Sequence, residues 1–186
     1  QTPAYAMLRS LVGSEMCIRD RSKRVQLMGS GSILREVIAA ANILAEDFGI
    51  QADVWSCPSF NELKRDGDDC VRWNLMHPDQ KPRIPHVTAC LEKHSGPVVA
   101  ATDYVKLFAD QIRAYVGRNY HVLGTDGFGR SDTRASLRRH FEVNRYYVTV
   151  AALKTLADEG TIPAKTVKSA ISKYKLDPEK PNPLNV

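Results

Sequence analysis

The sequence lacks the long apolar run that a membrane-spanning helix requires. A bilayer crossing takes about 20 consecutive apolar residues, and no stretch of the 186 residues approaches that length. The beginning of the chain also lacks a basic segment followed by an apolar run, which is the pattern of a secretory signal peptide. We therefore expect a soluble, cytoplasmic protein with no membrane partner.

Metal-ligand spacing is also missing. The four cysteines contain no C-x-x-C pair, and the five histidines contain no H-E-x-x-H motif. These patterns argue against a zinc site. Scattered cysteines in a chain without a leader are typical of reduced thiols that pack as small apolar side chains.

Positive charge is unevenly distributed along the chain. The formal net charge is +5, but five basic and two acidic residues lie within residues 1–24, which leaves +2 for the remainder. Arg134, Arg138 and Arg139 form a local cluster without the interleaved aromatic residues that stack on bases. We expect this cluster to be a solvated helix face, and we expect no nucleic-acid partner.

The first residues of the chain differ in pattern from the rest. Residues 1–22 mix apolar, charged and turn residues without a helical or strand period. Residues 11–20, LVGSEMCIRD, resemble the translation of a sequencing adapter. We therefore set residues 1–22 aside as an artefactual or disordered segment, and we expect the natural protein to continue upstream.

From residue 25 onward, strand and helix patterns alternate. The expected strands are short apolar runs at residues 25–29, 51–56, 97–101 and 121–123. Apolar spacings of three and four predict helices at residues 34–48 (ending at Gly49) and 104–116, two short helices within 59–78 that Gly67 separates, and a short helix at 88–92. The expected N-caps are Ser30 or Ser32, Asn61, Asp68 and Asp103.

The sequence predicts that the C-terminal third is helical. Residues 143–174 predict two helices that Gly160 and Pro163 separate, followed by a proline-rich, extended tail at 179–186. The alternation predicts an α/β domain over residues 23–178, with a mostly parallel sheet between helices on both faces.

Two glycine-containing segments follow expected strands. The GSGS of residues 29–32 could hold a phosphate at a helix N-terminus, but Leu34 stands where a dinucleotide fingerprint needs its third glycine. A tight strand-to-helix turn is the favoured interpretation.

The second segment, residues 124–143, contains the candidate site residues Asp126, Arg130, Asp132 and Arg134. We expect Arg130 to pair with Asp126 and Asp132 to cap the next helix, so that the loop fixes a domain or subunit contact. Direct contact with a substrate or effector is the alternative. His140 is expected to be a surface or capping residue, and no residue is assigned a catalytic role.

Four long segments carry a family resemblance. They read VQLMGSGSILREVIAAANILAEDFGI, SFNELKRDGDDCVRWNLMHP, ATDYVKLFADQIRAYV and GTDGFGRSDTRASLRRHFEV. Together they resemble the C-terminal region of homodimeric pyruvate dehydrogenase decarboxylating components over residues 25–186. The resemblance implies a three-layer, transketolase C-terminal-like domain with a five-stranded, mostly parallel sheet and a helical C-terminal tail.

The resemblance also implies a parent enzyme that uses thiamine diphosphate and Mg²⁺. That enzyme decarboxylates pyruvate and reductively acetylates the lipoyl group of a dihydrolipoyl acetyltransferase core. The family's G-D-G…N-N motif is absent here, and Gly67-Asp68 lacks the glycine and asparagines that would complete it. We therefore expect this chain to support a homodimer and its domain assembly, to bind neither cofactor and to be inactive alone.

Two other interpretations stay open at this point. The chain could be a stand-alone module that binds an anion or nucleotide at its GSGS turn. It could also be a separate subunit of a split enzyme, which would bind a catalytic partner in trans.

Overall fold

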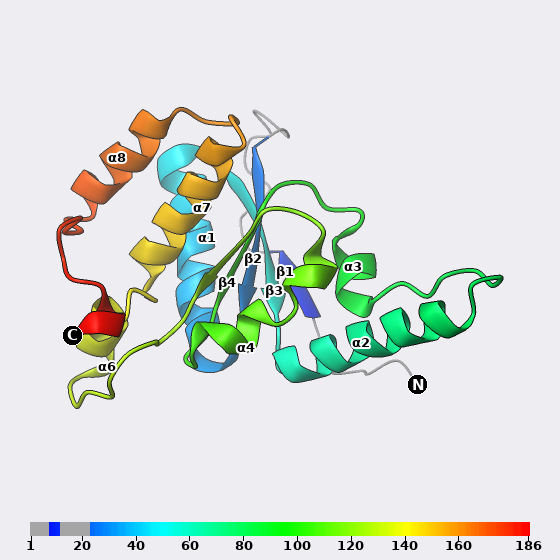
Figure 1. The fold of residues 1–186 in the computed structure, drawn as a ribbon. Helices are drawn as coiled ribbons and strands as arrows, with labels where there is room; N and C mark the ends of the chain where they lie inside the picture. The colour runs from blue at the N-terminus through cyan, green and yellow to red at the C-terminus, as the bar shows by residue number, and fades with distance from the viewer. Residues whose placement is uncertain (1–7, 12–22) are drawn as a thin grey trace.

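The computed structural model describes residues 8–11 and 23–186, and its centre is a five-stranded sheet (Figure 1). The strands are β1 (Leu8–Leu11), β2 (Arg24–Gly29), β3 (Gln51–Ser56), β4 (Val98–Ala101) and β5 (Tyr120–Leu123). Their order across the sheet is β1-β3-β2-β4-β5, with β1 antiparallel to β3 and the other pairs parallel. The predicted α/β class and the four strands predicted after residue 23 are confirmed.

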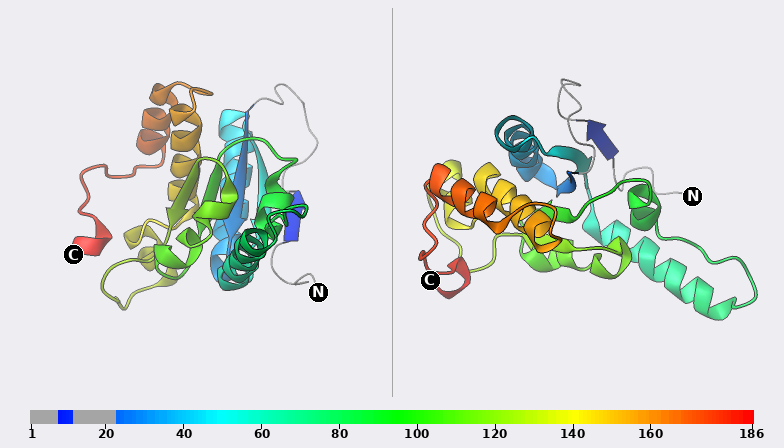
Figure 2. Two further views of the ribbon diagram at one scale, coloured as in Figure 1. Left: turned by 45° about the vertical axis from the view of Figure 1, so that its right-hand side comes forward. Right: turned by 90° about the horizontal axis from the view of Figure 1, so that it is seen from above.

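Helices cover both faces of the sheet, which gives three layers (Figure 2). One face packs on α1 (Leu34–Phe48), α7 (Arg145–Asp158) and α8 (Ala164–Lys173). The other face packs on α2 (Phe60–Met76), α3 (His86–Leu91), α4 (Lys106–Asp110) and α5 (Arg113–Val116). Successive strand residues point to opposite faces, so Val99 and Ala101 enter the first core while Val98 and Ala100 enter the second.

The turn between β2 and α1 has the tight geometry expected of its glycines. It contains one 3-10 turn, η1 (Gly31–Ile33), and a Cβ added to Gly29 would lie 2.9 Å from the Cα of Leu34. The cap prediction was wrong, because neither Ser30 nor Ser32 makes a side-chain cap hydrogen bond. At its other end α1 stops at the predicted Gly49, whose φ of 63° is left-handed.

The prediction of two short helices in residues 59–78 was wrong. A single helix, α2, runs through Gly67, and Ser59 caps it by accepting a hydrogen bond from the Glu62 N–H. Gly67 is needed for packing, since a Cβ there would lie 2.3 Å from a ring carbon of Tyr115. Neither Asn61 nor Asp68 is a cap.

The helix predicted over residues 104–116 is divided into α4 and α5. In a continuous helix the Ala109 carbonyl would accept from the Arg113 N–H, but here it accepts from the Tyr120 hydroxyl at 2.7 Å. Val105, rather than Asp103, occupies the N-cap position of α4. The apolar pattern was misleading because Leu107 is 72% exposed.

The C-terminal third contains α6 (Arg134–His140), followed by the two predicted helices α7 and α8. Asn144 caps α7 by accepting from the N–H groups of Tyr146 and Tyr147. The tail was expected to be extended, but it ends in a 3-10 turn, η2 (Pro183–Asn185). Gly127, at φ 119°, lets this tail approach the loop after β5, because a Cβ there would lie 2.3 Å from the Pro183 carbonyl oxygen.

The expectation for residues 1–22 can be compared with the structure only at Leu8–Leu11, which form the edge strand β1. Leu8–Leu11 are the fifth strand of the sheet in this structure, and the assignment of residues 1–22 as artefactual or disordered stays a prediction. The rest of the segment, including residues 12–20 of the adapter-like run, lies outside the described residues. Among the helices that the structure does describe, none is long and apolar enough to cross a membrane.

Candidate functional site

Three loops meet at the carboxyl edge of the parallel strands, where α/β sheets commonly place ligands and contacts. They follow β2, β4 and β5, and hydrogen bonds join them. The Thr125 hydroxyl donates to the Asp103 carbonyl at 2.8 Å, and the Ser32 hydroxyl donates to the Asp103 carboxylate at 2.5 Å. The turn after β2 is thereby fixed to the loops after β4 and β5.

An ionic network continues from Ser32 into the helical layer. The Arg138 guanidinium donates to the Ser32 hydroxyl at 2.9 Å and to the Glu36 carboxylate at 3.1 Å. Arg145 donates to Glu36 from its backbone N–H at 2.9 Å and from its guanidinium at 3.0 and 3.1 Å. This cluster of Asp103, Ser32, Arg138, Glu36 and Arg145, called here the carboxyl-edge network, ties α1 to α6 and α7.

Glu36 is ionised within this network. Its side chain is only 9% exposed, and burial alone would raise its pKa. The hydrogen bonds and positive charges of Arg145, together with the charge of Arg138, outweigh burial and lower the pKa of Glu36 below 4.5. Hydrogen bonding to the same carboxylate raises the pKa of Arg145.

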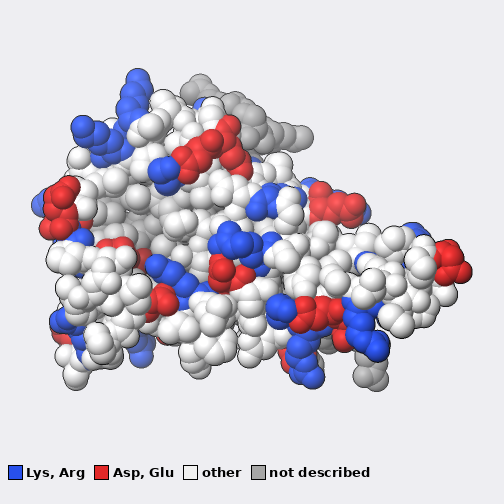
Figure 3. Space-filling view, in the orientation of Figure 1, with Lys and Arg blue, Asp and Glu red and all other residues white. Residues whose placement is uncertain are grey.

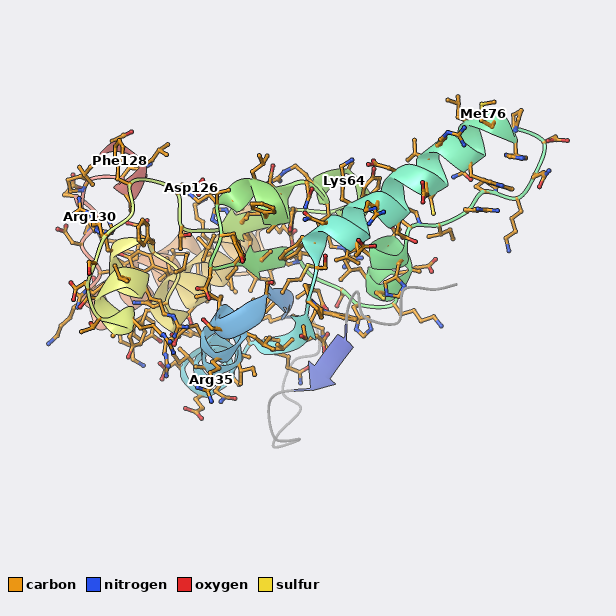
Figure 4. The ribbon with its side chains drawn as sticks, turned by 90° about the horizontal axis from the view of Figure 1, so that it is seen from below. Arg35, Lys64, Met76, Asp126, Phe128 and Arg130 are labelled. Atoms are coloured by element: carbon orange, nitrogen blue, oxygen red, sulfur yellow. The ribbon has the colours of Figure 1, made fainter. Side chains whose placement is uncertain are left out.

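A cavity of about 600 Å³ lies beside the network. Its lining comes from the loop after β5, from α6 and from the ends of the neighbouring loops, and it includes Ser32, Asp103, Gly129, Arg130, Asp132, Arg134 and Arg138. Figure 4 shows Asp126, Phe128 and Arg130 along this loop, with Asp126 nearer α4. Phe128 is 75% exposed.

Three of the four predicted site residues lie on the loop after β5 and Arg134 begins α6, but they do not make the predicted contacts. No ion pair joins Arg130 to Asp126 in the part of the chain that the structure describes; Asp126 instead accepts from the Lys106 N–H at 3.2 Å. Asp132 is not the cap of α6, since Thr133 takes that position and Asp132 accepts from the Thr133 N–H.

The prediction that Arg138 lies on a solvated helix face was wrong, because its side chain is 14% exposed and bonded to Glu36. Glu36 and Arg145 were not identified from the sequence. A signal was present, since Glu36 lies one helical turn from Ile33 and Ala40 on the apolar stripe of α1. An acidic residue on a buried stripe indicates a buried cationic partner.

His140 lies at the end of α6, half-buried rather than on the surface, with its ring 4.9 Å from that of Phe141. Its Nε2 atom is buried and has no hydrogen-bond partner among the described residues. Burial and the charges of Arg130 and Lys180 lower its pKa, so the neutral ring is favoured.

The GSGS turn offers little to an anion. The Ser32 hydroxyl already donates to Asp103, whose carboxylate would repel a phosphate placed there. Among residues 8–11 and 23–186, no group of three histidine, cysteine or acidic side chains is arranged to hold a metal ion.

Comparison with known proteins identifies the fold. The family described as "Transketolase-like TK C-terminal domain" matches residues 14–144. The chain belongs to this family. Solved transketolase structures have the same fold. The match to a Pichia stipitis transketolase in complex with sedoheptulose 7-phosphate has a TM-score of 0.52 at 18% identity. It covers 84% of this chain and 18% of that one. An inactive β4 tetramer of a split-gene transketolase gives a TM-score of 0.51 at 16% identity, over 81% of this chain and 42% of that one.

Several relatives of this transketolase-like domain with high identity are named pyruvate dehydrogenase E1 component. The protein from Cupriavidus necator is 61% identical over 163 residues, which are 88% of this chain and 18% of that protein. The Pseudomonas aeruginosa protein is 58% identical over 90% of this chain and 19% of its own length. The Escherichia coli K12 protein is 56% identical over 86% and 18%. The chain therefore spans less than a fifth of these relatives.

Proposed function

We propose that this chain is the C-terminal domain of a pyruvate dehydrogenase decarboxylating component. The observation that carries the proposal is the 61% identity to the Cupriavidus necator E1 component over 88% of the chain. Identity at that level far exceeds the 16–18% identity to transketolases that share the fold, so it indicates more than a common fold. The proposed parent decarboxylates pyruvate and transfers the acetyl group to the lipoyl group of a dihydrolipoyl acetyltransferase core. Its cytoplasmic location and homodimeric state belong to the same proposal.

In this proposal thiamine diphosphate and Mg²⁺ supply the decarboxylation chemistry in the parent enzyme. The described residues do not fit either group. Asp68, which follows Gly67, lies within α2 and is engaged by Lys64 at 2.5 Å and by the Tyr115 hydroxyl at 2.5 Å. These contacts lower the pKa of Asp68, but they leave it in a structural role. We assign the cofactors to other domains of the parent and no catalytic step to this chain.

The role proposed for this domain is assembly. The loop after β5 carries Asp126, Arg130 and Asp132 and leads into Arg134 at the start of α6. It is held by hydrogen bonds at its start, through Thr125 and Asp126. Arg130 and Arg134 are exposed and have no ion pair among the described residues. A rigid base with unpaired arginines is suited to charge-assisted hydrogen bonds with another domain or subunit. We propose that the loop contacts the neighbouring domain within the parent dimer.

A domain exchange tests the proposal. Residues 24–186 of this chain would replace the corresponding segment of the Cupriavidus necator E1 component. We expect a dimeric chimera that decarboxylates pyruvate and, with its acetyltransferase, acetylates lipoyl groups. A folded chimera with no pyruvate-dependent activity would contradict the enzyme assignment.

The role of the loop is tested in the same chimera with Arg130→Ala. The expected result is weaker dimerisation or faster loss of thiamine diphosphate on dilution, by about tenfold if one charge-assisted contact is lost. Lys93→Ala, an exposed change beyond the amino ends of the strands, is the matched control. Unchanged dimerisation and cofactor retention in Arg130→Ala would contradict the loop contact while leaving the enzyme assignment intact.

A further inference from the structure

The chain after α8 returns to the loop after β5. Residues 175–186, called here the strap, begin at Lys175, whose φ of 51° is left-handed, and end in the turn η2. Figures 1 and 2 both show this segment (red) running from the end of α8 to α6 and the loop before it. The strap therefore reaches residues that lie far from it in the sequence.

Lys180 is the first anchor of the strap. Its ammonium group donates to the His140 carbonyl at 2.5 Å and to the Glu142 carboxylate at 3.1 Å. His140 is the last residue of α6, where a carbonyl has no partner within the helix and a cation is favoured. The Lys180 side chain is only 23% exposed. Lys180 thus holds the carboxyl end of α6.

Charge at this anchor acts through direct contacts. Over the face shown in Figure 3, Lys and Arg side chains are interspersed with Asp and Glu. Because exposed charges are screened beyond a short distance, removing the Lys180 charge should affect its own contacts and not a wider field.

Glu142, the partner of Lys180, has a strained backbone. Its φ of 61° is left-handed, which is uncommon for a residue other than glycine. The Val143 N–H donates to the Arg138 carbonyl at 3.0 Å across this residue, so the turn sets how α6 meets α7. A strained residue persists only where surrounding contacts fix it, and the ion pair with Lys180 is such a contact.

Pro183 is the second anchor. It is buried in η2, whose turn Asn182 stabilises by accepting from the Leu184 N–H at 3.0 Å. The Pro183 carbonyl lies so close to Gly127 that a Cβ there would be 2.3 Å from its oxygen. In Figure 4 the loop at Phe128 passes beside this turn, in agreement with that contact. The strap therefore packs directly on the loop after β5.

The middle of that loop depends on these two anchors. Hydrogen bonds fix the loop before residues 127–131, at Thr125 and Asp126, and after them, at Thr133. Within the described part of the chain, no hydrogen bond holds residues 127–131 themselves. The strap meets this stretch at Gly127 and holds α6 beyond its far end, so it limits the positions that Arg130 can reach.

We propose that the strap is a positioning element that holds the loop after β5 in place, with Lys180 and Pro183 as its positioning residues. Restraint of the loop before binding reduces the conformational entropy that is lost on contact. The benefit of this order for assembly rests on the proposed function, but the restraint itself is a property of this chain alone.

Nuclear magnetic resonance relaxation of the 186-residue chain tests the second anchor. Removal of residues 182–186 should lower the backbone order parameters of residues 127–131 from the value of about 0.85 typical of rigid backbone to below about 0.6. Strands β2 and β4 serve as the internal reference and should keep their values. Order parameters that stay unchanged in residues 127–131 would overturn the proposal, and so would a loop that is already mobile in the complete chain.

Hydrogen exchange tests the first anchor. Lys180→Met keeps most of the side-chain length but removes the charge. The amides of Phe141 and Val143, which close the end of α6, should then exchange at least about tenfold faster, as expected for the loss of a hydrogen bond to a charged group. Lys168→Met, at an exposed position of α8, is the matched control. Thermal unfolding should show both variants folded, and equal exchange in Lys180→Met and wild type would contradict the role of Lys180.

The consequence for assembly is tested in the chimera that contains residues 24–186. Arg130→Ala should weaken dimerisation or cofactor retention less when residues 182–186 are removed than in the complete chimera, because a mobile loop has already lost part of its contact. Equal effects would overturn the positioning role. If Arg130→Ala changes neither chimera, the loop contact of the proposed function fails, and the order parameters still decide whether the strap holds the loop.

Discussion

Two buried charged networks in this domain use similar residues in different ways. Between β2 and β3, Asp53 accepts from Arg24 and from Gln26, each at 2.9 Å, and Gln26 accepts from the Trp55 indole at 2.8 Å. All four residues lie on two paired strands. The carboxyl-edge network instead joins α1, α6, α7 and a loop, and it borders a cavity.

The two networks therefore have different roles. The strand network stabilises the sheet, whereas the carboxyl-edge network positions a loop that carries exposed charged residues. The strand network joins the two strands to the segment before β4, where Gln26 donates to the Ser95 carbonyl and His94 lies 3.4 Å from Asp53, so its polar groups stabilise the sheet and this segment. The carboxyl-edge network orients α6 and the loop before it, where Arg130 and Arg134 remain exposed. A rigid hydrogen-bonded network beside unpaired charged side chains is typical of sites that bind another domain or subunit. Mutations in the two networks should therefore differ in which property they change.

The largest effect is expected for Glu36→Ala. The variant leaves Arg138 and Arg145 without their shared carboxylate, and removing one partner of a buried ion pair costs about 3–5 kcal/mol. Because Arg145 is 43% exposed, we expect a value near the lower end, about 3 kcal/mol. Urea unfolding measures the change. Glu159→Gln, an exposed acidic residue on another part of the surface, should stay within about 0.5 kcal/mol of the wild type. A similar loss in both variants would refute the special role of Glu36.

A smaller effect is expected for Gln26→Leu in the strand network. The variant leaves the Trp55 indole N–H, the Asp53 carboxylate and the Ser95 carbonyl short of one partner each, which should cost about 2 kcal/mol. The double variant Gln26→Leu with Trp55→Phe removes the indole donor too and should recover part of the loss. In the chimera, Gln26→Leu should leave dimerisation unchanged at temperatures where the protein is folded. Weaker dimerisation there would erase the distinction between the two networks.

The pH dependence of stability sharpens the same comparison. The pKa of Glu36 is lowered in the folded state, because hydrogen bonds and charges from Arg145 and Arg138 outweigh burial. Its contribution is therefore fully present above the unfolded value of 4.5 and is lost as the pH falls through the lower folded value. The stability gap between wild type and Glu36→Gln should be constant from pH 7 to about pH 5 and should narrow below about pH 4. A gap that widens on acidification would show that Glu36 is protonated at neutral pH.

Periodicity identified the strands and most helices because both cores are built from alternating or helical apolar residues, as in Val98–Ala101 and α1. It failed where a distant contact decides the local structure. Gly67 stays helical because Tyr115 packs on it, and the helix after residue 104 divides because Tyr120 takes a carbonyl. The loop after β5 was identified as the candidate site from its composition. The role of Glu36 in supporting this loop could not be predicted, because Glu36 and its partner Arg145 are 109 residues apart in the sequence.

The smallest effect on stability is expected for Arg130→Ala in the 186-residue chain. Arg130 is exposed and has no hydrogen bond or ion pair among the described residues, so its removal should change the free energy of unfolding by no more than about 0.5 kcal/mol. Urea unfolding beside Arg138→Ala gives the contrast, because Arg138 is bonded to Glu36 and to Ser32. Loss of more than about 1 kcal/mol in Arg130→Ala would mean that this arginine belongs to the supporting network. A stable variant that weakens the chimeric dimer would place Arg130 at a contact, because only a bound partner can then account for the loss.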